Sequence, residues 1–234
     1  MGKLVSMNIS DELSADRPFD AVMFDMDGTL VNSQEAILAS YHDATISVLG
    51  EPFPVEKEDV EKIIQMRGQE SFPLIAGGDE KKAAEIKELF GQAYLKHQER
   101  IPLFPDVEVM LGTLKKEGIK LGIATSKARV RFEEDMKRTG LAEYFDVTFT
   151  GDDVANAKPA PDQIIAGIEH FGIKPERMLF IGDGSNDIIA GRDAGAKTAG
   201  VNFGFHPELV AAENPTYLLD SYLELIPIVL PAKG

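Results

Sequence analysis

Cysteine is absent from the 234 residues, which excludes disulfide bonds, zinc–thiolate sites and thiol nucleophiles. Positive charge is scarce, because 24 lysines and arginines stand against 39 aspartates and glutamates, a net charge of −15. This balance argues against a nucleic acid or an anionic membrane as the main partner. No apolar run is long enough to span a membrane, and the N-terminal stretch lacks the apolar core of a signal peptide. We therefore expect a soluble, cytoplasmic protein.

Two kinds of pattern divide the chain. A short apolar strand is predicted at 19–25, followed by helices at 34–49, 55–66 and 79–100, with a break at 70–78 and no strand signal between 34 and 101. From residue 102 onwards helices and strands alternate. The helices are predicted at 106–118 (with Asp106 as N-cap), 128–140, 161–172, 186–195 and 217–230, and the strands at 119–126, 144–151, 177–184 and 196–202.

The alternation indicates an α/β fold, a doubly wound, Rossmann-like and mainly parallel sheet with helices on both faces. The first strand is separated from the others by the helical block. The sequence thus predicts a core of residues 18–32 and 102–234, an all-helical insertion at 33–101 and an N-terminal arm at 1–17.

Acidic side chains follow the predicted strands. Asp25 and Asp27 follow the first strand, and Asp183 and Asp187 follow the strand at 177–184. In parallel sheets ligands bind beyond the carboxyl ends of the strands, so we expect these carboxylates to converge. Oxygen-only ligands favour a hard cation, and Mg²⁺ is the natural choice. The plainer alternative is that each pair lies in a solvated turn or next to a helix N-terminus.

Other strand ends are suited to a phosphate group. Thr125 and Ser126 lie between a strand and a helix, where hydroxyls and free N–H groups favour an anion, and Lys158 precedes a helix that begins with proline. One aspartate could attack phosphorus, and a second could move the proton. Asp25 and Asp27 fit these two roles.

Four motifs in this order resemble the haloacid dehalogenase-like (HAD) hydrolase superfamily over residues 19–227. They are FDMDGTL at 24–30, the hydroxyl ending GIATS at 122–126, the lysine of AKPAPD at 157–162 and IGDGSNDIIAGRDAG at 181–195. The helical insertion resembles the C1 type of cap, as in phosphoglycolate phosphatases and β-phosphoglucomutases.

The resemblance implies a role for each matching residue. Asp25 would be the nucleophile and a metal ligand, and Asp27 the acid/base, with its backbone carbonyl on Mg²⁺. Asp183 would complete the protein ligands and Asp187 would support the site. Thr125 and Lys158 would hold the phosphoryl group. The substrate-binding residues are expected to be Gly28, Thr29, Ser126 and Arg67.

These residues predict a Mg²⁺-dependent phosphatase acting on a small phosphorylated metabolite through an aspartyl-phosphate. Asp27 favours phosphoryl chemistry over dehalogenation, and Thr29 resembles the phosphatases more than the mutases. A sugar-phosphate mutase and a non-catalytic phosphometabolite-binding protein stay as alternatives.

Asn32 replaces an aspartate common among relatives, and we expect it to affect cap docking or specificity. Arg67 is equally well explained as a surface residue, and Lys127 and Arg129 are expected to be solvated. The substrate and the oligomeric state are left open.

Overall fold

The computed structural model describes residues 17–53, 63, 66 and 68–231, although not the side chains of Gln69 and Arg100. Six strands form one parallel sheet in the order β3-β2-β1-β4-β5-β6. They are β1 (Ala21–Phe24), β2 (Lys120–Ala124), β3 (Val147–Phe149), β4 (Met178–Gly182), β5 (Lys197–Val201) and β6 (Tyr217–Leu219). This confirms the predicted doubly wound α/β fold.

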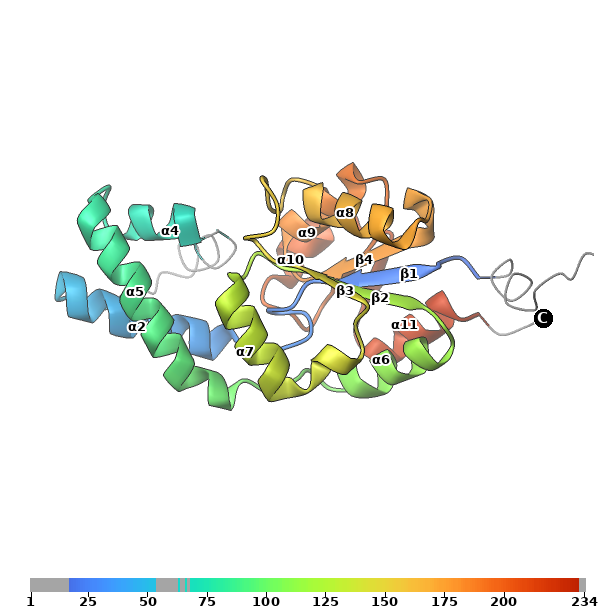
Figure 1. Ribbon diagram of the computed structural model, residues 1–234, viewed down its shortest axis with the longest axis horizontal. Coiled ribbons are helices and arrows are strands. Elements are labelled where there is room, and N and C mark those ends of the chain that lie inside the picture. The colour runs from blue at the N-terminus through green and yellow to red at the C-terminus, as the bar shows by residue number, and fades with distance from the viewer. Residues whose placement is uncertain (1–16, 54–62, 64–65, 67, 232–234) are drawn as a thin grey trace, which may run out of the picture.

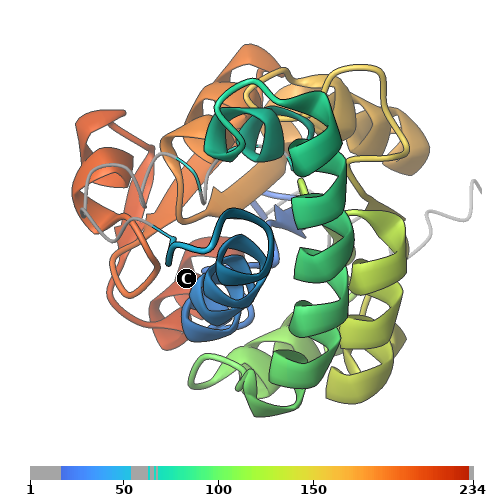
Figure 2. The same cartoon turned by 90° about the vertical axis from the view of Figure 1, so that its left-hand side faces the viewer.

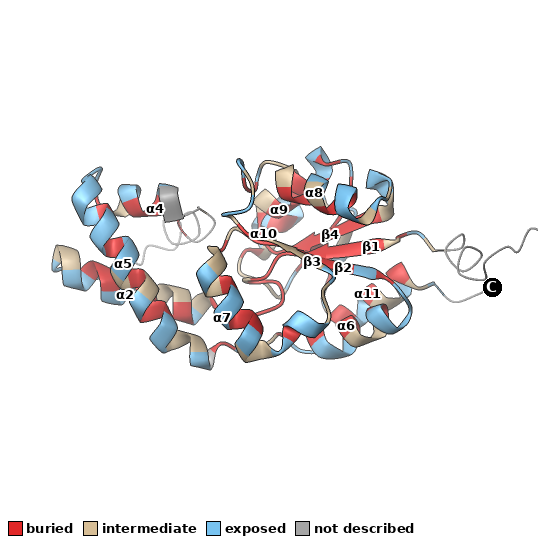
Figure 3. Ribbon diagram, viewed as in Figure 1, coloured by how far each residue is buried: buried red, intermediate tan, exposed pale blue. Residues whose placement is uncertain are grey.

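Helices cover both faces of the sheet because successive strand residues point to opposite sides. Val22 and Phe24 of β1 belong to a buried cluster with α6 (Val107–Lys116) and α11 (Tyr222–Val229). Ala21 and Met23 belong to a second cluster with α8 (Asp162–Phe171) and α9 (Ser185–Asp193). Figures 1 and 3 show these two layers on either side of the sheet, whose central strands β1 and β4 are fully buried.

Three further helices lie at one end of the sheet, the end that faces the viewer in Figure 2. They are α2 (Gln34–Leu49), α4 (Gly68–Ile75) and α5 (Glu80–His97), with α7 (Arg129–Thr139) between them and the sheet. The described residues between 34 and 101 contain no strand, as predicted. Gly50, whose φ of 74° is left-handed, caps the end of α2. Asp79 caps the start of α5, and its carboxylate accepts hydrogen bonds from the backbone N–H groups of Lys81 and Lys82.

The two connections between the helical segment and the sheet pair with each other. The backbone N–H of Asn32 donates to the carbonyl of Pro102 (2.9 Å), and Val31 forms an antiparallel bridge with Leu103. Asn32 itself is exposed on this pair of connections. They coincide with the boundaries at residues 32 and 102, while the division into two domains stays a prediction.

Four local expectations were wrong or incomplete. The predicted break at 70–78 is mostly helical, because packing of Phe72 against Tyr41 and Phe90 outweighs the interior Pro73. The single helix predicted at 217–230 is instead β6 and α11, separated by Ser221, whose hydroxyl accepts a hydrogen bond from the N–H of Leu223. The short helix α10 (Pro207–Ala212) was not predicted.

The fourth expectation concerns Asp106, which occupies the N-cap of α6 but forms no capping side-chain hydrogen bond. Its φ of 63° is left-handed, so its backbone does not have the extended conformation that N-cap residues usually adopt.

The helix predicted at 55–66 lies almost entirely outside the described residues. None of the described helices combines the length and hydrophobicity that a membrane crossing needs.

Candidate active site

The predicted site residues come together because the strands that precede them are parallel neighbours. β1 pairs with β2 on one side and with β4 on the other, in matching register. Asp25, Thr125 and Asp183 each follow one of these strands and therefore meet at the same edge of the sheet. All three side chains are buried.

Lys158 links two of the carboxylates. Its ammonium donates to Asp25 Oδ1 and to Asp187 Oδ1, each at 2.6 Å, and all three residues are at least 93% buried. Burial by itself lowers the pKa of Lys158, but the charges of Asp187 and Asp25 outweigh it and hold the pKa above its usual value. Lys158 is therefore a protonated, fixed positive charge at the carboxyl end of β1.

Burial and mutual repulsion raise the pKa values of two carboxylates in this cluster. Burial, opposed by Lys158 and reinforced by the charge of Asp187, raises the pKa of Asp25 to about 7. Burial, with the charges of Asp187 and Asp25, raises the pKa of Asp183 well above its usual value. The cluster thus carries more negative charge than one lysine neutralises, and a further cation would favour its ionised form.

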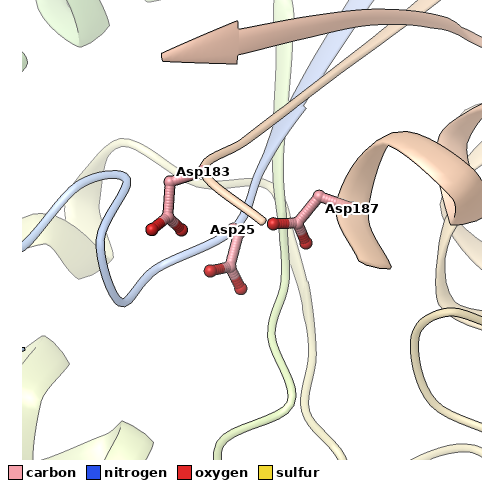
Figure 4. A group of neighbouring side chains, drawn as sticks. All are labelled: Asp25, Asp183 and Asp187. Atoms are coloured by element: carbon pink, nitrogen blue, oxygen red, sulfur yellow. The ribbon is translucent and has the colours of Figure 1, made fainter. Parts of the chain in front are cut away.

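The donor set suits a hard divalent cation. Carboxylate oxygens of Asp25, Asp183 and Asp187 all lie within 4.8 Å of one another, and Figure 4 shows them around one space. Both oxygens of Asp187 accept hydrogen bonds from the protein, one from Lys158 and one from the backbone N–H of Gly184 (3.0 Å). Both oxygens of Asp183 also accept hydrogen bonds, Oδ1 from the hydroxyl of Thr29 (3.3 Å) and Oδ2 from the backbone N–H of Phe205 (2.8 Å). Asp25 therefore differs from the other two carboxylates, because none of the described residues donates a hydrogen bond to its Oδ2.

Small residues surround Asp183. A Cβ atom on Gly28 would lie 2.1 Å from Asp183 Oδ2, and one on Gly204 would lie 2.3 Å from the Asp183 Cβ. Gly28 also has a left-handed φ of 78°. Glycine at position 28 is thus required both by the turn after β1 and by the approach of this carboxylate.

Thr29 and Gly28 do not line the cavity at this edge of the sheet. Thr29 is fully buried, and its hydroxyl donates to Asp183 Oδ1 (3.3 Å) while its carbonyl accepts from the hydroxyl of Tyr222 (2.7 Å). The structure therefore gives no support to direct substrate contact by these two residues. Both residues instead lie against Asp183, and the hydroxyl of Thr29 orients its carboxylate.

Thr125 and Ser126 do line the cavity. The carbonyl of Thr125 accepts a hydrogen bond from the buried side chain of Gln163 (2.9 Å), and its hydroxyl accepts one from the backbone N–H of Lys127 (3.3 Å). These bonds fix the loop after β2. Thr125 and Ser126 thus line the same cavity as Asp25.

Asp27 differs from the other acids because it is partly exposed, with 19% of its side chain accessible. Its Oδ1 accepts a hydrogen bond from the hydroxyl of Ser33 and pairs with the ammonium of Lys127 at 2.9 Å. The side chain is thus held at the cavity without being sealed from it.

Lys127 is buried, which corrects the expectation that it is solvated. Its ammonium contacts the hydroxyl of Tyr94 (2.8 Å) on α5 and the carboxylate of Asp135 on α7, in addition to Asp27. Charge interactions with Asp27, Tyr94 and Asp135 outweigh burial and raise its pKa above the usual value. In the sequence, only its position two residues after Thr125 indicates that Lys127 lies near the site. No local pattern identifies its partners, because Asp27 and Tyr94 are distant from it in the sequence.

The cavity has a volume of about 130 Å³ and is bounded by two groups of elements. On the sheet side it is lined by Asp25, Asp27, Thr125, Ser126, Lys127, Arg131, Lys158, Asp183, Gly184, Asn186, Asp187, Phe205 and His206; on the helical side by Ile37, Tyr41, Met66, Phe72, Phe90 and Tyr94. Its size suits a small compound.

Two further residues were considered in the sequence, Arg67 and Arg129. Arg67 lies outside the described residues, so its role stays a prediction. Arg129 does not line the cavity; it pairs with Asp153, and its backbone N–H donates to Asp152 (2.8 Å). These two acids therefore fix the start of α7 and the loop after β3.

Comparison with known proteins agrees with this geometry. Residues 22–201 match the family described as haloacid dehalogenase-like hydrolase. Pyrophosphatase PpaX of Bacillus cereus (strain AH820) is 35% identical over 212 residues, which cover 90% of this chain and 96% of the relative.

Solved structures are similar over nearly the whole length. A protein from Haemophilus somnus 129pt, described as a predicted phosphoglycolate phosphatase, has a TM-score of 0.81 at 25% identity, with 91% of this chain and 99% of that chain covered. A candidate β-phosphoglucomutase from Thermotoga maritima has a TM-score of 0.74 at 25% identity, with 91% and 100% covered. With this match over the ordered motifs and the carboxylate–lysine cluster, the chain belongs to the haloacid dehalogenase-like hydrolase family.

Proposed function

We propose that the protein is a Mg²⁺-dependent phosphatase that hydrolyses a small phosphomonoester through an aspartyl-phosphate on Asp25. The position of Asp25 carries the proposal. One of its oxygens is bound by Lys158, its side chain is 11% exposed toward the cavity, and none of the described residues donates a hydrogen bond to Oδ2. A buried carboxylate with one oxygen fixed and one free is suited to nucleophilic attack.

The reaction would proceed in two displacements. A carboxylate oxygen of Asp25 forms a bond to phosphorus while the bond to the leaving oxygen breaks, and Asp27 protonates that oxygen. Asp27 then takes a proton from a water molecule, whose oxygen attacks phosphorus and releases Asp25. The contacts of Asp27 with Ser33 and Lys127 keep its carboxylate in place for both transfers.

The other residues would hold the transferred group. Lys158, Thr125 and Ser126 are placed to bind phosphoryl oxygens, and Asp187 orients Lys158. Asp25, Asp183 and the backbone carbonyl of Asp27 would hold Mg²⁺, which supplies positive charge for the phosphoryl oxygens. Residues 33–101 would act as a cap that excludes water and selects the substrate, since their aromatic side chains form the facing wall.

Phosphate release from small esters in the presence of Mg²⁺ tests the proposal. We expect Asp25→Asn to abolish turnover with an unchanged fold. A turnover of Asp25→Asn near that of the wild type would overturn the mechanism. Mg²⁺ should also raise the melting temperature of the wild type but not that of Asp183→Asn, because the latter loses a ligand. Appearance of an isomerised sugar phosphate in place of inorganic phosphate would instead identify a mutase.

A further inference from the structure

The cavity contains more charge than the proposed phosphoryl site uses. Among the described residues its cationic lining consists of Lys127, Arg131 and Lys158. Lys158 is paired with Asp25 and Asp187, and Lys127 with Asp27 and Asp135. Both lysines are therefore neutralised by the carboxylates around them.

Arg131 differs from both lysines. No carboxylate of the described residues lies within ion-pair distance of its guanidinium, and no side chain or backbone carbonyl among them accepts a hydrogen bond from it. Arg131 is only partly buried, and it lines the cavity. A cavity that already contains four carboxylates thus also contains one cation whose N–H donors are not used by any of the described residues.

Aromatic rings of the helical segment hold the guanidinium in position. Its central carbon lies 5.4 Å from the ring centre of Phe90 and 5.9 Å from that of Tyr94, both on α5. Such cation–π contacts orient an arginine while leaving its N–H groups directed outward. The positive charge also reaches Tyr41 on α2, where it opposes the rise in the pKa of the tyrosine caused by burial. Arg131 therefore lies where the sheet side and the helical side of the cavity meet.

We propose that Arg131 binds a second anionic group of the substrate, so that the substrate is a small phosphate compound that carries an additional carboxylate or phosphate. This inference rests on the proposed function, because Asp25 and Lys158 would receive the transferred phosphoryl group. A planar guanidinium with free donors matches a carboxylate or phosphate through paired hydrogen bonds. The volume of about 130 Å³ favours a compound of a few heavy atoms over a nucleotide.

The test compares substrates that differ in the second charge. Pyrophosphate and 2-phosphoglycolate provide a second phosphate or a carboxylate, and ethyl phosphate provides neither. For the wild type and Arg131→Gln, kcat/KM is measured by phosphate release with Mg²⁺. We expect Arg131→Gln to lower kcat/KM for the preferred doubly charged compound about 10- to 100-fold and that for ethyl phosphate less than about 3-fold. Which of the two compounds is affected identifies the second group.

Arg129→Gln is the matched control. Arg129 lies on the same helix and is also an arginine, but it pairs with Asp153 outside the cavity. We expect its replacement to change none of the three kcat/KM values more than about 2-fold. An equal loss for charged and neutral compounds in Arg131→Gln would show that Arg131 only packs against α5, and would overturn the proposal.

A binding measurement separates this proposal from the proposed function. Calorimetry on Asp25→Asn with Mg²⁺ gives the affinity of each compound without turnover. Weaker binding of the doubly charged compound in Asp25→Asn/Arg131→Gln, at unchanged affinity for ethyl phosphate, would support the role of Arg131 even if the wild type released no phosphate. Equal affinity of all three compounds for Asp25→Asn would refute it.

Discussion

The two walls of the cavity are made of different kinds of side chain. The sheet side presents carboxylates and lysines that are fixed by ion pairs, such as Lys158 between Asp25 and Asp187. The helical side presents Tyr41, Phe72 and Phe90 from three separate helices, whose rings lie 4.5 to 5.9 Å apart. This difference indicates two roles: the residues at the strand ends carry out the reaction, and the helices determine the shape of the cavity.

The ammonium of Lys127 connects the two walls of the cavity. Lys127 belongs to the loop after β2, yet it contacts Tyr94 of α5 as well as Asp27. The position of the proposed acid/base residue thus depends on a contact with the helical segment. Substitutions on each side and at this junction should therefore have different consequences.

The largest effect is expected on the sheet side. Lys158→Met leaves the buried carboxylates of Asp25 and Asp187 without their counter-charge. We expect kcat/KM to fall about 10²- to 10³-fold and the free energy of unfolding to fall by about 3–5 kcal/mol, measured by phosphate release and denaturant titration. Lys120→Met, at the exposed start of β2, is the control and should do neither. A Lys158→Met enzyme with more than a tenth of wild-type kcat/KM would show that the sheet side does not carry the chemistry.

An intermediate effect is expected at the junction. Lys127→Met removes the cation that Asp27 shares with Tyr94 and Asp135. We expect kcat to fall about 10-fold while KM changes less than about 3-fold, because the proton transfer and not the binding is disturbed. Steady-state kinetics separates the two parameters. A rise in KM at constant kcat would instead assign Lys127 to substrate binding.

The smallest effect is expected on the helical side. Phe72→Leu retains an apolar side chain of similar size but alters the wall facing Asp25. We expect KM to change about 2- to 10-fold and the free energy of unfolding to fall by less than about 1.5 kcal/mol. Kinetics with two substrates of different size measures whether the change depends on shape. A loss of kcat comparable to that of Lys158→Met would contradict the division between the walls.

Much of the sheet side was predictable because its signals are local. Asp25, Thr125 and Asp183 each follow an apolar strand directly, and parallel strands bring their carboxyl ends to one edge. The edge strand β6 was missed because its three residues continue the apolar pattern of α11. Helix α4 was read as a break because the effect of Pro73 is local, whereas the packing of Phe72 that offsets it is not.

The sequence by itself determined the family, the parallel α/β fold and the strand ends on which the charged residues lie, because motif order and hydrophobic periodicity are properties of neighbouring residues. Only the tertiary structure decided which charges are paired and which are free. Lys127 was expected in solvent and is buried among partners 8 to 100 residues away, while Arg131 was not singled out and is the described cation of the cavity without an ion-pair partner. Ion pairing and burial are set by groups from distant segments, so they are fixed only when the sheet and the helices pack together.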